Sequence, residues 1–313
     1  MAIATTITAR ESPGGPPPGL KGISKLRWSV KNPPAEPNVT FEGKTVLVTG
    51  ANAGLGFQAA VKYAEKGASK LILAVRSVAK GEEAKQAIAQ RSGRHPSFIT
   101  VLPVDLSSYA SVQKFITALE GKAPQLDVVL LNAGLANPTF IKSAEGYEMA
   151  LQVNVLSTAL MAVLLLPLLR KTAVAKEVTP HLTFVNSIGH EEVKKDWYSD
   201  SGSLLRRAND QSKYDATKTY SMVKLLGMAA MKAIAKATTK PDGTPEVVVN
   251  ACCPFMCRTD LGRNFPLPLK AFMAGFQYFT ARSAEEGSRT LVGATALGPE
   301  SQGRFWHHDI LHP

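Results

Sequence analysis

The sequence contains few cysteines, and their positions argue against two kinds of site. Its three cysteines, Cys252, Cys253 and Cys257, lie within one short segment of the 313 residues. Because no second cluster exists to complete a disulfide framework or a metal site, we expect reduced thiols in a cytoplasmic protein. Two of the six histidines, His307 and His308, are adjacent near the C-terminus but have no further ligand at a useful spacing. We predict a surface tail there rather than a metal site, and no metal elsewhere.

Long basic runs are also absent, although the chain has a net charge of +11 and a pI near 9.5. No tract of five or more lysines and arginines occurs. Scattered basic residues without a nucleic-acid-binding motif argue against a nucleic-acid partner. An anionic cofactor, or a peripheral contact with an acidic membrane surface, explains the charge equally well.

No apolar run has the length of a membrane span. Residues 1–10 lack the continuous apolar stretch of a secretory signal. The strongest apolar run, residues 155–169, is too short to cross a bilayer and contains Pro167 near its end. We expect it to form a buried helix. With 45% hydrophobic and 19% charged residues, the chain has the composition of a soluble globular protein.

Proline and glycine distinguish the N-terminal segment from the rest of the chain. Residues 12–19 read SPGGPPPG, and two more prolines follow Asn32. Such a segment buries too little apolar surface to offset the entropy lost on ordering. Residues 1–40 are therefore predicted to form a flexible arm that drapes over the domain, and residues 41–313 to form one domain.

The domain opens with a strand, a glycine turn and a helix. Residues 45–49 suit a buried parallel strand, and residues 57–64 have helical periodicity. Between them lie Gly50, Gly54 and Gly56. A turn without β-carbons lets a pyrophosphate approach the backbone, and the first helical turn offers free N–H groups to that anion. This pattern predicts a dinucleotide-binding unit.

The residue after the second strand, at 70–75, indicates which dinucleotide is bound. In such units this position meets the adenosine ribose. An acidic residue would accept hydrogen bonds from the free ribose hydroxyls of NAD, whereas Arg76 offers positive charge to a 2′-phosphate. NADP(H) is therefore the predicted cofactor.

Strands and helices alternate through the remainder of the chain. The apolar patterns predict strands at 97–104, 126–131, 182–186, 247–253 and 303–306, and helices at 81–90, 111–119, 146–170, 220–237 and 284–295. This alternation predicts an α/β, single-domain Rossmann fold with a doubly wound, mostly parallel sheet of about seven strands.

Polar and small residues follow two of these strands. Asp105 could accept a hydrogen bond from the adenine amino group or cap the next helix, although Ser107 or Ser108 could be that cap instead. Asn132-Ala133-Gly134 would allow a cofactor to pack on the backbone. Asn154 lies in an otherwise apolar helix, so its amide needs polar partners.

Five motifs in this order resemble those of the short-chain dehydrogenase/reductase superfamily, over roughly residues 43–310. They are TGANAGLG at 49–56, Asn132-Ala133-Gly134, Asn154, Ser187, and YSMVK at 220–224. The segment after the third strand, the long gap after Ser187 and the tail at 303–306 look most like the retinol-dehydrogenase-like and fungal secondary-metabolism members. The resemblance implies an oxidoreductase that reduces a ketone or aldehyde, or oxidises the matching alcohol, by hydride transfer.

The resemblance also implies a role for each catalytic residue. Tyr220 would be the acid/base, Ser187 would bond the substrate oxygen, Lys224 would hold the nicotinamide ribose, and Asn154 would keep a water in a proton relay. A phenol titrates near ~10, so the Lys224 ammonium, one helical turn away, is expected to make it more acidic. The implied cofactor set is Gly50, Asn52, Ala53, Gly54, Leu55, Gly56, Arg76, Asp105, Leu106, Asn132, Ala133, Gly134, Tyr220, Lys224, Pro254 and Thr259.

A second tyrosine and lysine have the same spacing. Tyr214 and Lys218 are also four residues apart, and Thr217 before the lysine resembles the family more closely than Val223 does. The apolar run after Lys224 and its distance from the sixth strand favour the Tyr220 pair. Both pairs remain open from the sequence.

The chain departs from the family pattern near the substrate site. Phe255 follows Pro254 where the family usually has glycine, and it could narrow the substrate pocket or, more simply, pack against the aromatic residues of 265–279. The segments 190–219, with Trp197 and Tyr198, and 262–282 are predicted to form a substrate loop and lid. A bulky lipophilic substrate is therefore expected.

Two other functions are compatible with this fold. One is a non-redox reaction such as an isomerisation, dehydration or cyclisation, and the other is a cofactor-sensing binding module. The helices at 155–169 and 220–237 resemble those that pair subunits in the family, which implies a homodimer or tetramer.

Overall fold

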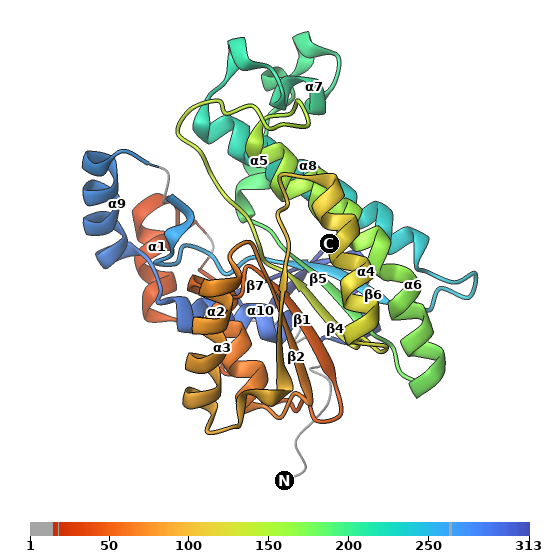
Figure 1. The fold of residues 1–313 in the computed structure, drawn as a ribbon. Coiled ribbons are helices and arrows are strands. Elements are labelled where there is room, and N and C mark those ends of the chain that lie inside the picture. Colours follow the sequence, from red (N-terminus) through yellow and green to blue (C-terminus); the bar gives the residue numbers. More distant parts are fainter. Residues whose placement is uncertain (1–14, 18, 263–264) are drawn as a thin grey trace.

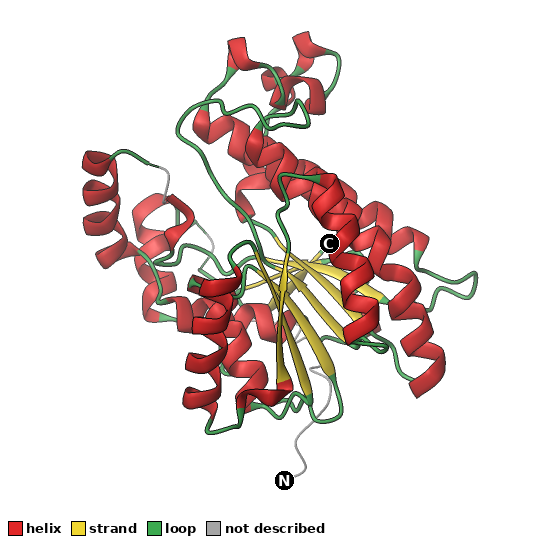
Figure 2. Cartoon of the chain, in the orientation of Figure 1, coloured by secondary structure: helices red, strands yellow, loops and turns green. Residues whose placement is uncertain are grey.

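The computed structural model describes residues 15–17, 19–262 and 265–313. One eight-stranded sheet runs through the centre of the molecule in the order β3-β2-β1-β4-β5-β6-β7-β8 (Figures 1 and 2). Seven strands are parallel, and β8 is antiparallel to β7. The bounds are β1 Thr45–Thr49, β2 Lys70–Val75, β3 Ile99–Pro103, β4 Val128–Leu131, β5 His181–Val185, β6 Val248–Cys252, β7 Phe305–His307 and β8 Ile310–His312.

The predicted doubly wound α/β fold is confirmed, but the sheet has one strand more than expected. The extra strand, β8, follows a two-residue turn at His308 and Asp309, whose φ angles are +51° and +57°. Two left-handed residues in succession match the twist of a tight hairpin. Two histidine-rich strands thus fold on each other where the sequence predicts a surface tail, and that prediction is wrong.

Helices cover both faces of the sheet (Figure 1). The helices α2 Gly54–Glu65, α3 Val78–Ser92 and α10 Ala284–Ala294 pack on one face, and α4 Tyr109–Lys122, α6 Thr158–Lys176 and α8 Ala216–Ala237 on the other. Alternate residues of β1 enter different cores: Leu47 faces the α4–α6–α8 side, and Val46 and Val48 face the α2–α10 side. Strands buried on both faces explain the continuous apolar runs in the sequence.

The strand order reverses at β1, which pairs with β2 on one side and β4 on the other. The loops after these strands diverge towards opposite faces, and ligands of open parallel sheets bind in the crevice this leaves. Gly50, Arg76 and Asn132 each directly follow one of these three strands. The fold therefore gathers the predicted cofactor residues at one edge.

One long helical segment crosses the α4–α6–α8 side. It begins with α5 Met149–Leu151, continues as a π-helical stretch Gln152–Ser157, and ends with α6, which passes through Pro167. By length and composition Met149–Lys176 could span a membrane, but 61% of its apolar window is buried. Leu165 and Leu169 lie in the core. The predicted buried helix is confirmed and extends further than expected.

The first part of the predicted arm, residues 1–14 and 18, lies outside the described residues. The described part contains a helix that the sequence does not predict, α1 Gly22–Lys31. Buried Arg282 holds it, because its Nε donates to the Ser29 carbonyl (2.8 Å) and its Nη2 to the Asn32 carbonyl (2.9 Å). The aromatic segment after β6 likewise forms a helix, α9 Leu267–Thr280, which contacts α1.

Candidate functional site

The glycine turn after β1 leaves no room for side chains. Gly50 and Gly54 have left-handed φ angles of +66° and +54°. A Cβ on Gly56 would lie 2.4 Å from Asn132 Nδ2 and 2.5 Å from the Gly50 carbonyl oxygen. The N-cap residue of α2 is Ala53, which has no side chain that could accept a hydrogen bond from the first N–H groups of the helix. This geometry suits a pyrophosphate.

The end of β4 forms the other side of this turn. Asn132 Nδ2 donates to the Thr49 carbonyl, and the Ala133 N–H donates to Thr49 Oγ1, both at 2.9 Å. These hydrogen bonds tie the segment Asn132–Gly134 to the end of β1. A cofactor crossing the sheet edge would therefore meet a fixed backbone with little side-chain bulk.

A hollow of about 400 Å³ lies between the glycine turn and α3. Asn52, Ala53 and Lys80 are among its lining residues, with Phe57, Glu83, Ala84 and Ala87. Arg76 is exposed directly after β2, four residues before Lys80. Sequence reasoning missed Lys80, although the spacing of two cations across the start of α3 was visible. Two cations at this edge suit a 2′-phosphate.

Asp105 does not cap the helix that follows it. Its Oδ1 accepts hydrogen bonds from the Ser107 N–H (2.9 Å) and hydroxyl (2.7 Å). Ser108 is the N-cap of α4, and its side chain accepts from the Ser111 N–H. Of the alternatives left open, Ser108 is therefore the cap. Asp105 is fixed beside Leu106, which is buried.

Ser187, Tyr220 and Lys224 converge at the end of β5. Both Tyr220 and Lys224 project from α8, and the Lys224 Nζ lies 5.6 Å from the centre of the Tyr220 ring. The Lys224 ammonium also donates to the Val185 carbonyl at 3.4 Å. Ser187 follows directly after Val185 and Asn186, and its side chain lies near enough to Tyr220 to lower the pKa of the phenol. The structure thus brings three of the four predicted catalytic side chains together.

Burial controls the protonation of this pair. It raises the pKa of Tyr220 to about 12, which the nearby Ser187 side chain opposes only in part. It lowers the pKa of Lys224 to about 8, against the influence of the nearby Cys253 and Cys252 thiols. The sequence predicts a more acidic phenol, whereas the pKa of Tyr220 is raised in the structure because burial disfavours the charged phenolate.

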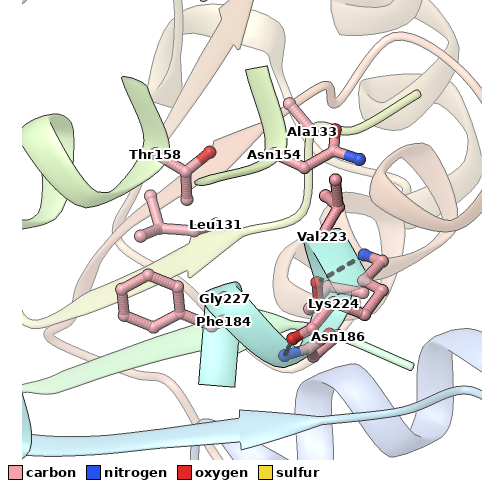
Figure 3. A pocket seen from close by; sticks show the side chains of 10 residues that line it. Leu131, Ala133, Asn154, Thr158, Phe184, Asn186, Val223, Lys224 and Gly227 are labelled. Atoms are coloured by element: carbon pink, nitrogen blue, oxygen red, sulfur yellow. Dashed lines mark hydrogen bonds between the residues drawn. The ribbon is translucent and has the colours of Figure 1, made fainter. Parts of the chain in front are cut away.

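Asn154 lies across a small cavity from Lys224 (Figure 3). It sits in the π-helical stretch, a feature that often occurs at functional sites. Its amide is fixed to Leu135, donating to the carbonyl (2.8 Å) and accepting from the N–H (2.9 Å). Within the cavity, the centre of a water molecule can occupy about 10 Å³, which is enough space for one water.

The rival pair is arranged differently. Tyr214 precedes α8, so it and Lys218 are not neighbours on one helix. The Tyr214 hydroxyl donates to the Asn137 carbonyl (2.8 Å), and exposed Lys218 stacks over the Trp197 ring at 5.5 Å. Neither residue lines the cavity that contains Asn154.

The segment after β6 takes an unusual backbone conformation. Phe255 has a left-handed φ of +63°, so this position keeps the conformation that favours glycine although it carries a ring. Cys253 Sγ accepts from the N–H groups of Phe255 (3.3 Å) and Ile188 (3.4 Å), which ties this turn to the loop containing Ser187. A Cβ on Gly54 would lie 3.7 Å from Thr259 Cβ, so the segment reaches the glycine turn.

The Phe255 ring packs on a partner that the sequence does not predict. Its centre lies 4.6 Å from the ring of His308, and Lys25 and Arg282 lie within 6 Å of it. Packing is thus observed against the β7–β8 turn, and packing against residues 265–279 stays a prediction. His307 and His308 are 5% and 4% exposed, and their Nδ1 atoms are 2.9 Å apart.

The known proteins that this chain resembles include several short-chain dehydrogenases. A family model described as short chain dehydrogenase matches residues 44–179. The chain is 44% identical to the short-chain dehydrogenase/reductase ffsI of Aspergillus flavipes over 94% of this chain and 85% of that protein. It is 42% identical to the short-chain dehydrogenase/reductase phmF of Phaeosphaeria nodorum over 98% of this chain and 87% of that protein. The solved Pseudomonas aeruginosa RhlG/NADP complex superposes with a TM-score of 0.64 at 22% identity, over 85% of this chain and 94% of that one.

Proposed function

The chain belongs to the short-chain dehydrogenase/reductase family, and on that basis we propose that it is an NADPH-dependent oxidoreductase. The proposed reaction reduces a ketone or aldehyde of a bulky lipophilic molecule, or oxidises the matching alcohol. The observation that carries the proposal is the placement of Tyr220 and Lys224 on one face of α8, beside Ser187 and Asn154. Such a set supplies a proton and orients a carbonyl at one point.

The residues at the sheet edge fit the proposed cofactor. A side chain at Gly56 would collide with Asn132 and the backbone, and α2 begins without a capping side chain. Arg76 and Lys80 lie where the 2′-phosphate of NADP would be bound. When bound, NADPH would supply the hydride. Asn52, Leu55, Gly134, Pro254 and Thr259 complete the proposed binding set.

Each catalytic side chain has a proposed task. Tyr220 donates its hydroxyl proton to the carbonyl oxygen as negative charge develops there, and Ser187 donates a second hydrogen bond to that oxygen. Lys224 stabilises the phenolate that Tyr220 becomes. A water in the cavity between Lys224 and Asn154 would return a proton to this pair. The raised pKa of Tyr220 keeps the phenol protonated and ready to donate.

Replacing Tyr220 tests the assignment of the acid. Tyr220→Phe removes the donated proton and is expected to lower kcat at least ~100-fold, because general acid catalysis contributes about that much. Loss of absorbance at the nicotinamide band with a panel of lipophilic carbonyl compounds measures the rate. Tyr214→Phe is the matched control and should keep most of the activity. Equal losses in both variants, or an unchanged rate in Tyr220→Phe, would refute the assignment.

The substrate class rests on the segments around the site. Trp197 and Tyr198 in the insert after β5 are half-buried, and so is Phe276 on the inner side of α9. We propose that segments 190–219 and 262–282 form the substrate loop and lid. A secondary metabolite is the proposed kind of substrate. The proposal also includes a cytoplasmic homodimer or tetramer with a peripheral membrane contact.

A non-redox reaction is the second candidate function, because Phe255 fills a position that glycine usually occupies. Turnover of a substrate without net consumption of NADPH would favour an isomerase, dehydratase or cyclase. Tight NADPH binding without reaction of any carbonyl compound would favour a cofactor-sensing module.

A further inference from the structure

Helix α9 has one charged residue, the exposed Lys270 in its first turn, and the rest of its exposed surface is uncharged. Met273, Phe276, Gln277 and Thr280 are half-buried or buried, and their helical spacing makes them the side that faces the rest of the molecule. The opposite side consists of eight residues that are all exposed. We call it the apolar face of α9: Leu267, Pro268, Ala271, Phe272, Ala274, Gly275, Tyr278 and Phe279.

The large side chains of this face are unusually open to water. Leu267 is 81% exposed, and Phe272, Tyr278 and Phe279 are each 67–68% exposed. Soluble monomers rarely leave a contiguous apolar patch of this kind uncovered, and such patches mark interaction sites. The face also points away from the molecule, because α9 lies at its edge beyond α1 (Figure 1).

Positive charge lies on the helix that packs beside α9. Helix α1, which packs beside α9, exposes Lys21, Arg27 and Lys31 together with apolar Ile23. The sequence from Gly15 to Ala35 and from Leu261 to Ala284 contains no aspartate or glutamate. An apolar, aromatic surface beside a helix with exposed cations matches the pattern of helices that lie in a membrane interface.

We propose that α1 and α9 together dock the protein on an anionic phospholipid surface. The apolar face of α9 would enter the boundary between head groups and acyl chains, and the α1 cations would bind acidic head groups. A second copy of this chain fits less well, because a symmetric contact through this face would place the α1 cations of both copies near one another. The inference refines the membrane contact within the proposed function and does not depend on the hydride transfer.

Vesicle flotation of the full chain tests the proposal. Vesicles of phosphatidylcholine with about one-third phosphatidylserine should bind the protein at least ~10-fold more tightly than pure phosphatidylcholine. Phe272→Ser/Phe279→Ser should lose most of this binding. Val174→Ser/Val178→Ser, which removes two exposed apolar side chains elsewhere, should not. Arg27→Gln/Lys31→Gln should weaken binding about tenfold, and the control Lys232→Gln/Lys236→Gln much less.

Three results would overturn the proposal. The first is that the unaltered protein does not bind acidic vesicles. The second is that the Phe272→Ser/Phe279→Ser variant binds them as well as the unaltered protein does. The third is that the unaltered protein forms a dimer in analytical ultracentrifugation, the Phe272→Ser/Phe279→Ser variant is a monomer, and neither protein binds vesicles. Turnover of NADPH with a water-soluble carbonyl compound is measured on the same samples. Because that assay needs no membrane, failure of the docking proposal is separated from failure of the proposed reaction.

Discussion

In the proposed enzyme, cofactor choice is expected to depend on Arg76 and Lys80. Lys80 lines the hollow beside the glycine turn and exposed Arg76 directly follows β2, so each is expected to form a charge-assisted hydrogen bond with a 2′-phosphate. Arg76→Ala is expected to raise the KM for NADPH by ~10–100-fold, since such bonds contribute about 1.5–3 kcal/mol, and Lys80→Ala to raise it about tenfold. The KM for NADH should change little. Steady-state kinetics with both cofactors measure this.

Exposed Lys114 on α4 offers the matched control, because its removal leaves the cofactor edge intact. Lys114→Ala should leave both KM values unchanged. A parallel rise of the NADPH and NADH values in Arg76→Ala would show that Arg76 supports the fold of the edge instead of selecting the phosphate.

For single residues, the spacing of a motif predicts where a side chain lies on a helix better than it predicts how deeply that side chain is buried. The i, i+4 spacing of Tyr220 and Lys224 places them on one helical face, as expected. The same spacing at Tyr214 and Lys218 does not, because α8 begins only at Ala216, after Tyr214. The pKa of Tyr220 was predicted in the wrong direction, since the spacing of two residues says nothing about how deeply their surroundings bury them.

One buried side chain makes two hydrogen bonds that connect helix α1 to the domain. Arg282 is 1% exposed and donates to two carbonyls at the C-terminal end of α1. Arg282→Ala would leave both carbonyls without that donor, which should lower the free energy of unfolding by about 3 kcal/mol. Arg170→Ala, which removes an exposed ion pair with Glu246, should cost less than about 1 kcal/mol. Urea unfolding measures both values.

Limited trypsin digestion shows whether the loss is local. Cleavage at Lys25, Arg27 and Lys31 should become faster in Arg282→Ala before the rest of the chain is cut. If α1 stays as resistant as in the unaltered protein, Arg282 does not hold it.

Elements with long, regular patterns were predictable, and short or irregular ones were not. The strands at 45–49 and 70–75 agree with β1 and β2 to the residue. Helix α1 was missed because its segment follows a proline-rich run and gains its stability from Arg282, more than 240 positions later. Helix α9 was missed because only one of its sides packs on the protein, so no amphipathic period marks it in the sequence.

For the whole molecule, the alternation of strands and helices was enough to predict the fold. The contact between the N-terminal segment, the turn after β6 and the β7–β8 hairpin was not predictable, because it joins three segments that share no local pattern. Three rings meet there: the centre of the His308 ring lies 5.7 Å from that of Trp28 and 4.6 Å from that of Phe255. This cluster gives the protein several buried histidines, which bear on its stability in acid.

Stability should fall as the pH drops below about 6.5. Burial lowers the pKa of His181 to about 4, and it lowers the pKa of His307 and His308 as well, with help from the neighbouring histidines and from Lys25 and Arg282. The unfolded chain, with histidine pKa values near ~6.5, then binds more protons than the folded protein. Each such histidine should remove up to about 1.4 kcal/mol of unfolding free energy per pH unit between that value and its folded pKa.

One variant isolates this effect. Asparagine tolerates the left-handed backbone at position 308, so His308→Asn should fold and lose one histidine's share of the slope between pH 6.5 and 5. Burial raises the pKa of Glu148, which acts in the opposite sense, but this carboxyl is common to both proteins and cancels in the difference. Exposed His95→Gln should leave the slope unchanged. Should urea unfolding give His308→Asn the same slope as the unaltered protein, His308 is already protonated in the fold and the cluster does not control acid stability.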